Sequence, residues 1–312
     1  MRKYFFSFIF VMLFSIPALA CLNGEQMILA NSEMLYSDYE GEVPYGHDFA
    51  DKERLKAFLV SLEKGYQKTN DLDYLSDKGF ILIILGKYEE AIILYKKIES
   101  LEPNRYSTAS NIGTAYELIG NNVEALKWIE KAVKINPVSH FHSEWIHINI
   151  LKAKIKGRQF ITSKFLIGHD FGNDKAPVSN LNKDELYVLK RQMYYQLNER
   201  MSFVTPEDQI VAQLLFDLGN VAYLLGEKGD AFEDYKLAAE YGFSNPILED
   251  RIHLYSPIMK LNVGEKIRKE ITFNMRKPKV PQLIGTFTSV FALLITGLII
   301  YRFREKIKLV MK

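Results

Sequence analysis

Helical periodicity runs through most of the chain. Apolar residues recur at steps of three and four between residues 52 and 261, which places them on one side of successive helices. In the first such stretch they are Leu55, Phe58, Leu59 and Leu62. The segments that this pattern, or a helix-start signal, assigns to single helices are 52–68, 140–156, 182–201 and 247–261. The pattern predicts a protein built mainly of helices.

The N-terminus carries a continuous apolar run instead. Arg2 and Lys3 precede an apolar run over residues 4–16, and the small-residue site Ala18-Leu19-Ala20 comes after it. This order is typical of a cleaved signal peptide, which we predict for residues 1–20. The run is too short for a membrane-spanning helix, which needs roughly 20 residues.

Cys21 directly follows this site and is the only cysteine of the chain. Its position resembles that of the lipidated cysteine of bacterial lipoproteins, which makes Cys21 a candidate lipidation site. Those proteins usually carry a large aliphatic residue where this chain has Ala18. An ordinary cleavage site before Cys21 is therefore the alternative.

A second apolar run lies near the C-terminus. Residues 282–301 contain no charged side chain, and a helix of that length covers a bilayer core of about 30 Å. We predict a single transmembrane helix that anchors the protein in a membrane from Leu283 to Tyr301. Because a signal peptide directs the export of the residues after it, we expect the body to be extracytoplasmic, periplasmic in a bacterium. The basic tail, residues 302–312, then lies in the cytoplasm.

The middle of the chain contains an internal repeat. Residues 71–104 match the next stretch of the chain when shifted by 34 positions. The matching pairs are Gly79 and Gly113, Gly86 and Gly120, Glu90 and Glu124, Ala91 and Ala125, Lys97 and Lys131, and Pro103 and Pro137. A glycine inside the first helix lets the second helix approach closely, a glycine after it suits a left-handed helix end, and a proline stops the second helix.

These residues and their period resemble the tetratricopeptide repeat family over residues 72–138. A third copy lies further along, with Gly219, Gly226, Ala231 and Tyr235, in which Gly226 and Ala231 keep the spacing of Gly86 and Ala91. The resemblance implies an all-α solenoid of helical hairpins, each of which buries its apolar side against its neighbours.

The expected organisation combines these features. The segments are a signal peptide (1–20), an extended segment (21–51), N-terminal repeat helices (52–138, with clear repeats at 72–105 and 106–138), a degenerate repeat (139–204) with an inserted loop (157–181), a third repeat with a closing helix (205–262), a basic stalk (263–281), the transmembrane helix (282–301) and the tail (302–312). Long loops in compact folds are often functional, so the inserted loop is of interest.

Composition narrows the classes of function. The 40 Lys and Arg nearly balance 38 Asp and Glu, giving a net charge of +2, so we expect no nucleic-acid partner. One cysteine excludes an internal disulfide framework and CxxC-type zinc sites. The sequence also lacks the HExxH, GxSxG, P-loop and Rossmann patterns. We expect neither enzymatic activity nor a cofactor or metal.

Three of the six histidines lie together, at His140, His142 and His147. On a helix, His140, Glu144 and His147 share a face and would offer metal ligands. The alternative is that they are polar residues on the inner surface of a repeat, packed near Trp145. A metal-dependent or enzymatic accessory that uses these histidines and the inserted loop is therefore an alternative function.

The tetrapeptide Gly-His-Asp-Phe occurs twice, at residues 46–49 and 168–171. Both copies lie in stretches that read as loops, where they would share a ligand or pack together. A chain of this length yields about one four-residue match by chance, so the motif by itself predicts nothing.

Tetratricopeptide stacks bind partners in a concave groove lined by the first helices of successive repeats. The resemblance implies groove-facing positions at Asp77, Phe80, Asn111, Thr114, Glu117, Asp217, Asn220 and Tyr223. The family's best-known clamp grips a C-terminal carboxylate with Lys and Arg, whereas these positions are acidic, polar or aromatic. We therefore expect a neutral, basic or partly apolar ligand, the alternative for each residue being an ordinary solvated helix face.

The sequence thus predicts a membrane-tethered scaffold that binds a protein or peptide partner in a concave groove. Besides the metal-dependent accessory, a further alternative is a structural subunit that binds a membrane complex through the convex face of the solenoid.

Overall fold

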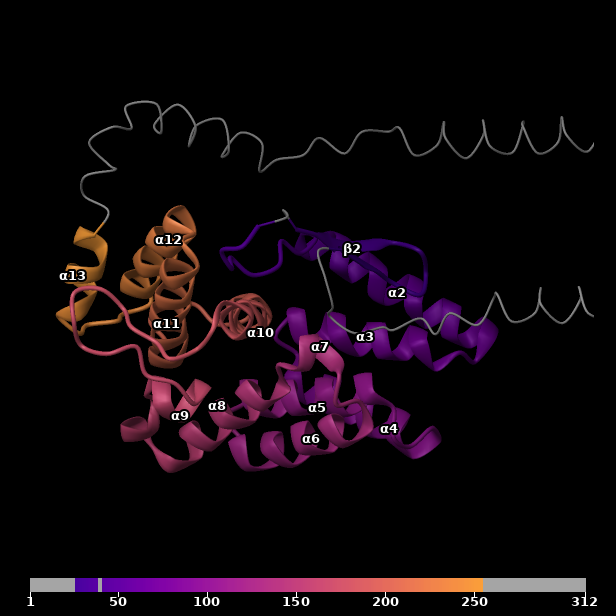
Figure 1. The fold of residues 1–312 in the computed structure, drawn as a ribbon. Helices are drawn as coiled ribbons and strands as arrows, with labels where there is room; N and C mark the ends of the chain where they lie inside the picture. The colour runs from indigo at the N-terminus through magenta and orange to yellow at the C-terminus, as the bar shows by residue number, and fades with distance from the viewer. Residues whose placement is uncertain (1–25, 39–40, 255–312) are drawn as a thin grey trace, which may run out of the picture. The chain divides into compact units, whose positions relative to one another are not determined.

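The structure is a computed structural model that describes residues 26–38 and 41–254. These residues belong to one compact unit, Met1–Pro257, and the second unit, Ile258–Lys312, lies outside the described residues. Helices form most of the described chain (Figure 1). The elements are β1 (Gln26–Ile28), β2 (Met34–Ser37), α2 (Lys52–Thr69), α3 (Leu72–Ile84), α4 (Tyr88–Leu101), α5 (Tyr106–Leu118), α6 (Asn122–Ile135), α7 (Ser139–His142), α8 (Glu144–Lys156), η1 (Arg158–Phe160), α9 (Ser163–Ile167), α10 (Lys183–Met201), α11 (Gln209–Leu225), α12 (Lys228–Glu240) and α13 (Ile247–His253).

Helices α3 and α4 form one hairpin, and α5 and α6 form the next. A β-carbon on Gly79 would lie 2.6 Å from the Tyr95 ring, and one on Gly113 would lie 2.5 Å from Ile129. The two helices of each hairpin thus touch where the sequence has no side chain. The predicted helical hairpins are confirmed.

The pair α11 and α12 repeats this design. A β-carbon on Gly219 would lie 2.6 Å from the ring of Tyr235, and Gly226 ends α11 with a φ of 86°. The third copy found in the sequence is therefore a hairpin built like the first two. It is separated from them by α7–α10, as its change of register requires.

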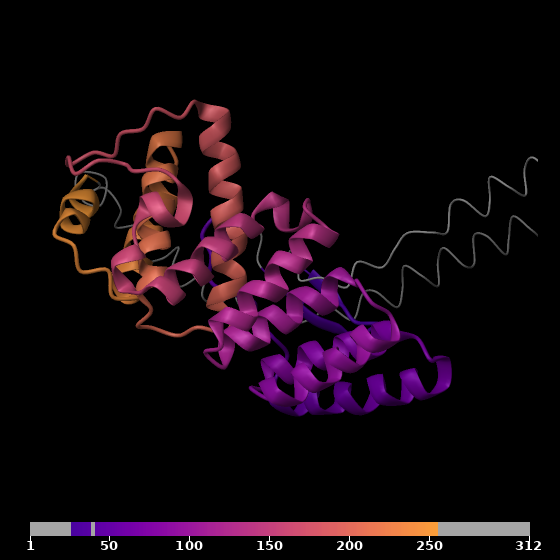
Figure 2. The same cartoon turned by 90° about the horizontal axis from the view of Figure 1, so that it is seen from below.

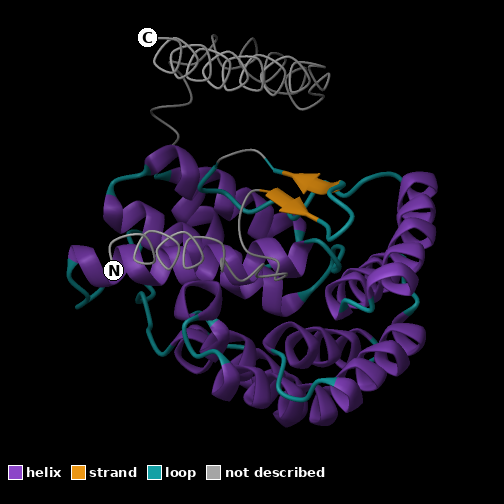
Figure 3. Cartoon of the chain, turned by 90° about the vertical axis from the view of Figure 1, so that its right-hand side faces the viewer, coloured by secondary structure: helices purple, strands orange, loops and turns teal. Residues whose placement is uncertain are grey.

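The N-terminal segment, expected to be extended, contains a small two-stranded sheet (Figure 3). Its strands are antiparallel, and Met27 pairs with Tyr36. One side of this sheet is buried: Met27 and Leu35 join Leu55 and Phe58 of α2 in a single apolar cluster. The segment therefore packs on the repeat helices.

The inserted segment, residues 157–181, also differs from the expected loop because it contains η1 and α9. Leu166, Ile167 and Phe171 are buried in the largest apolar cluster, together with residues of α10 and α11. These apolar side chains explain why the segment packs against the helices.

Helix α10 begins as the sequence indicates. The side chain of Asn182 accepts hydrogen bonds from the first turn, and Glu185 bonds back to the backbone of Asn182. Leu189, Met193 and Leu197 of α10 join the same apolar cluster as α11. Seen from below, α10 lies between the C-terminal hairpin and the helices of the first repeats (Figure 2).

The signal peptide, Cys21, the stalk, the transmembrane segment and the tail all lie outside the described residues. Among the helices that the structure describes, none is both long enough and apolar enough to cross a membrane.

Candidate functional site

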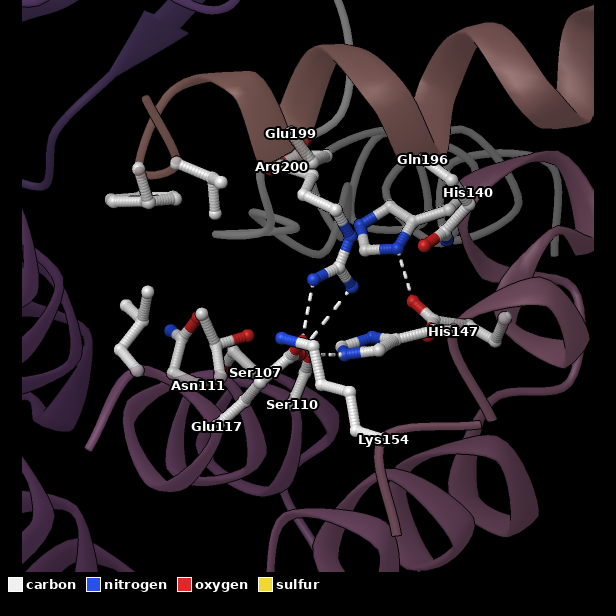
Figure 4. Close-up of a pocket in the computed structure, with 15 residues that line it drawn as sticks. Ser107, Ser110, Asn111, Glu117, His140, His147, Lys154, Gln196, Glu199 and Arg200 are labelled. Carbon is white, nitrogen blue, oxygen red and sulfur yellow. Dashed lines mark hydrogen bonds and ion pairs between the residues drawn. The ribbon is translucent and has the colours of Figure 1, made fainter. Parts of the chain in front are cut away.

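A cavity of about 220 Å³ lies between the inner face of α5, helices α7 and α8, and the end of α10. Figure 4 shows the side chains that line the cavity, which converge from these helices. The lining comprises Ser107, Ser110, Asn111, Thr114, Glu117, Leu118, His140, Glu144, His147, Lys154, Gln196, Glu199, Arg200, Phe203 and Val204.

The floor of the cavity holds a buried carboxylate. Three cationic or protonatable groups surround Glu117: Lys154 Nζ donates a hydrogen bond to Oε1 at 2.6 Å, His147 Nε2 lies 2.7 Å from Oε2, and Arg200 donates to both oxygens. These partners come from α8 and α10, so Glu117 ties its own helix to both.

A second carboxylate extends this network. Glu144 Oε1 contacts Nδ1 of His140, and it accepts a hydrogen bond from the hydroxyl of Tyr106 at 3.1 Å. Its other oxygen lies 3.5 Å from Nδ1 of His147. His147 therefore stands between two glutamates, one on each side of its ring.

The electrostatics favour the charged forms. Burial alone would raise the pKa of Glu117, but Arg200 and His147 hold it well below its usual range. The pKa of Glu144 is likewise lowered, against the effect of burial, by His140 and His147. Burial would lower the pKa of His147, yet its hydrogen bonds to the two glutamates outweigh this effect and raise that pKa. The network therefore pairs both buried carboxylates with positively charged side chains.

The part of α5 that precedes Glu117 lines the cavity with neutral side chains. Tyr95 donates its hydroxyl proton to the carbonyl oxygen of Ser76 at 2.8 Å, so the amide of Asn111 must donate to the Tyr95 oxygen, also at 2.8 Å. This leaves the amide oxygen of Asn111 as its remaining acceptor. Within the described residues, no hydrogen bond is made by the side-chain hydroxyls of Ser107, Ser110 and Thr114, which lie on the same helix.

Three of the eight positions proposed for the groove meet in this cavity: Asn111, Thr114 and Glu117. Asp77 and Phe80 do not lie in it. Asp77 is buried and accepts a hydrogen bond from the backbone nitrogen of Ala30 at 2.6 Å, and Phe80 packs edge-on against Phe49 and Phe203. The N-terminal segment therefore covers the inner face of α3.

The inner face of α11 is also covered. Asp217 accepts a hydrogen bond from Ser163 Oγ of α9 at 2.8 Å, and Asn220 accepts one from Tyr235 at 2.9 Å. Both residues are fully buried, and Tyr223 packs against the large apolar cluster. Asp217 and Asn220 are thus buried side chains rather than residues of a solvated groove.

The histidines do not form the metal site that their spacing allowed. His140 and His147 contact the glutamates, while His142 is exposed. Within the described residues, no three His, Cys, Asp or Glu side chains are placed so that they could hold a metal ion.

The first two hairpins match a known family. Residues 72–105 and 107–139 fit the model described as tetratricopeptide repeat. These two hairpins are tetratricopeptide repeats. The cavity lies on the inner helix of the second of these repeats. The third hairpin falls outside the matched residues and shares their packing.

Twenty-two chains of known structure match this chain. One is from the crystal structure of MamA, with 15% identity and a TM-score of 0.30 over 61% of this chain and 92% of that one. Another is a tetratricopeptide repeat protein from Parabacteroides merdae, with 16% identity and a TM-score of 0.29 over 65% and 78% of the two chains. None of the curated proteins compared matches the chain.

A third match comes from the structure of Naa15/Naa10 bound to HypK-THB, with 18% identity and a TM-score of 0.28 over 78% of this chain. This chain spans 36% of the length of that one. The family assignment rests on the repeat match and on the hairpin geometry.

Two parts of the site were not found from the sequence. Arg200 and Gln196 supply one wall, and Lys154 supplies a partner to Glu117. Glu117 and Arg200 are 83 residues apart, so no local spacing links them. The sequence signal nearest to them was the strong helix start at Asn182, which identified α10 but not the surface it faces.

Proposed function

We propose that this protein is a membrane-tethered tetratricopeptide scaffold that binds a short segment of a protein partner in the cavity beside Asn111. The observation that carries this proposal is the cavity itself, which lies on the inner helix of a tetratricopeptide repeat. Ser107, Ser110 and Thr114 line it with hydroxyls, and Asn111 adds an amide oxygen. Such groups suit the backbone and the side chain of a bound segment.

The size of the cavity limits what enters. A whole helix has a diameter of about 10 Å with its side chains, and α10 already lies against this face. A cavity of about 220 Å³ instead suits one large side chain or a chain end. The bound element is therefore a single anchoring residue with its adjoining backbone.

The charges of the lining favour a neutral anchor. Every carboxylate that lines the cavity has a basic partner: Glu117 has Arg200 and Lys154, Glu144 has His140, and Glu199 has His47 at 3.4 Å. A charged ligand would have to break one of these pairs, which is costly for buried groups. Hydrogen-bonding groups next to Leu118, Phe203 and Val204 favour a polar anchor with an apolar part.

The tether is the second half of the proposal. We infer from the sequence that residues 1–20 direct export, that residues 282–301 cross a membrane and that the repeats lie outside the cytoplasm. Protease added outside intact cells or spheroplasts should then digest residues 70–140 and spare the tail. A protected repeat region with a digested tail would reverse the proposed topology.

The cavity is tested by photo-crosslinking in the cells that produce the protein. A photo-reactive amino acid at Ser110 should crosslink to a discrete protein, and Asn111→Leu should abolish that adduct. The same reagent at Lys134, exposed on α6, is the matched control. The proposal is wrong if position 134 gives the same adduct or if Asn111→Leu leaves the Ser110 adduct unchanged.

A further inference from the structure

A second surface lies beside the turn that carries His140 and Phe141. It consists of Phe141, Tyr187, Arg191 and Tyr195, called here the outer aromatic patch. The guanidinium of Arg191 lies 4.5 Å from the ring centre of Phe141 and 5.9 Å from that of Tyr195, and the two rings are stacked 6.1 Å apart. Phe141 is 42% exposed and Tyr187 is 46% exposed. The patch is thus a cation stacked among accessible aromatic rings.

The backbone that presents Phe141 is strained. His140, Phe141 and His142 have φ angles of 47°, 58° and 60°, a left-handed conformation that costs a residue with a side chain about 1–2 kcal/mol. Gln192 on α10 donates its amide to the carbonyl oxygens of Phe141 and His142, both at 3.3 Å. The chain therefore holds an exposed ring on strained backbone. Burial of that ring does not account for the conformation.

Arg191 has more guanidinium N–H donors than its neighbours use. Its guanidinium donates hydrogen bonds to the hydroxyls of Tyr187, at 3.5 Å, and of Tyr195, and it makes no ion pair with a carboxylate of the described residues. A stacked guanidinium still presents the N–H groups of its edge. Those groups bind a carboxylate in a planar, two-point geometry that lysine does not reproduce.

We propose that the outer aromatic patch is a docking site for a protein segment that presents a carboxylate next to an aromatic or large aliphatic side chain. The carboxylate binds the edge of Arg191, and the neighbouring side chain packs on Phe141 and Tyr187. Arginine and aromatic residues are the types that contribute most at protein interfaces. The patch and the cavity are proposed to bind different segments. A negative result at one site therefore does not contradict the proposal for the other.

The test is a selection of random linear peptides on the immobilised full-length protein, followed by affinity measurements on single peptides. Selected peptides should combine Asp or Glu with an aromatic or aliphatic residue. Arg191→Ala should weaken their binding at least tenfold. Arg191→Lys, which keeps the charge but loses the planar group, should weaken it severalfold. Arg158→Ala, at an exposed arginine of η1 that makes no ion pair with the described residues, is the matched control and should change nothing.

Two further measurements keep the outcome clear. Replacing the acidic residue of a selected peptide by its amide should remove the dependence on Arg191, and Asn111→Leu in the cavity should leave binding unchanged. The proposal is overturned if no selected peptide depends on Arg191, or if peptides without an acidic residue bind as well. It is also overturned if Arg191→Ala changes the oligomeric state, because the patch then joins copies of this chain. Thermal unfolding of each variant establishes that it is folded.

Discussion

The ion pair between Glu117 and Arg200 should be a major link between the second repeat and α10. Both side chains are almost fully buried, and Arg200 cannot discharge by losing a proton. Replacing Glu117 by Gln leaves that guanidinium buried without its nearest carboxylate. Removing one partner of a buried pair costs about 3–5 kcal/mol of unfolding free energy, and we expect Glu117→Gln to fall in this range.

The reverse replacement should cost less. In Arg200→Met the carboxylate keeps Lys154 at 2.6 Å and His147 at 2.7 Å, so we expect a loss of about 2–3 kcal/mol. The double variant leaves no buried arginine without a carboxylate. Removing Arg200 should therefore add little to the loss of unfolding free energy that Glu117→Gln causes alone. The two single losses should therefore exceed the double loss by about 2 kcal/mol.

The measurement is urea unfolding of the full-length protein followed by tryptophan fluorescence. Trp145 donates a hydrogen bond to Gln192 of α10 at 3.1 Å, so it reports the contact between α8 and α10. Trp128, the only other tryptophan, is replaced by Phe in every variant. Measurements at pH 6 keep His147 charged, since its pKa is raised above the usual value. Additive losses, with a coupling below about 0.5 kcal/mol, would refute the reasoning.

Three further predictions concern stability. Burial raises the pKa of Asp77 to about 7, so its carboxyl binds a proton more tightly in the folded state than in the unfolded state. Ionisation of this carboxyl therefore destabilises the folded state as pH rises from about 4 to 7. Asp77→Asn should raise the unfolding free energy by about 1–3 kcal/mol at pH 8 and leave it unchanged at pH 4. His142→Gly should raise the melting temperature, because relief of the left-handed strain outweighs the flexibility of glycine by about 0.5–1 kcal/mol, and a lowered melting temperature would contradict this account. Gly79→Ala should cost about 1–3 kcal/mol through its clash with Tyr95, whereas Gly229→Ala, with nothing within 4 Å of the added carbon, should be neutral or stabilising by up to about 1 kcal/mol in chemical unfolding.

The repeats could be predicted because their signals are local. Gly79 and Tyr95 meet within one hairpin, and the turn glycines mark where each first helix ends. The same pair of positions recurs one period later, at Gly113 and Ile129. Comparison of the sequence with itself therefore reveals the pattern. The resemblance to the tetratricopeptide family rested on these positions and is confirmed by the repeat match.

The inner faces could be predicted only in part. Asn111, Thr114 and Glu117 share one helix face, and the structure gathers them around the cavity. Asp77 and Asp217 hold corresponding positions two residues before a packing glycine, yet segments from elsewhere in the chain cover both. Whether a helix face stays open depends on contacts between distant segments, which no local pattern encodes. The predictions for the two ends of the chain remain predictions.

Helix α10 changes how the solenoid should come apart. In a simple array each repeat touches only its neighbours, so terminal repeats can unravel one at a time. Here Asn198 accepts hydrogen bonds from the backbone of Tyr45 and Gly46, more than 150 residues away in the chain, and Arg200 reaches Glu117. When the repeats are pulled mechanically, the described unit should therefore unfold in one cooperative event at a single high force. A simple array would instead unfold in a series of equal steps.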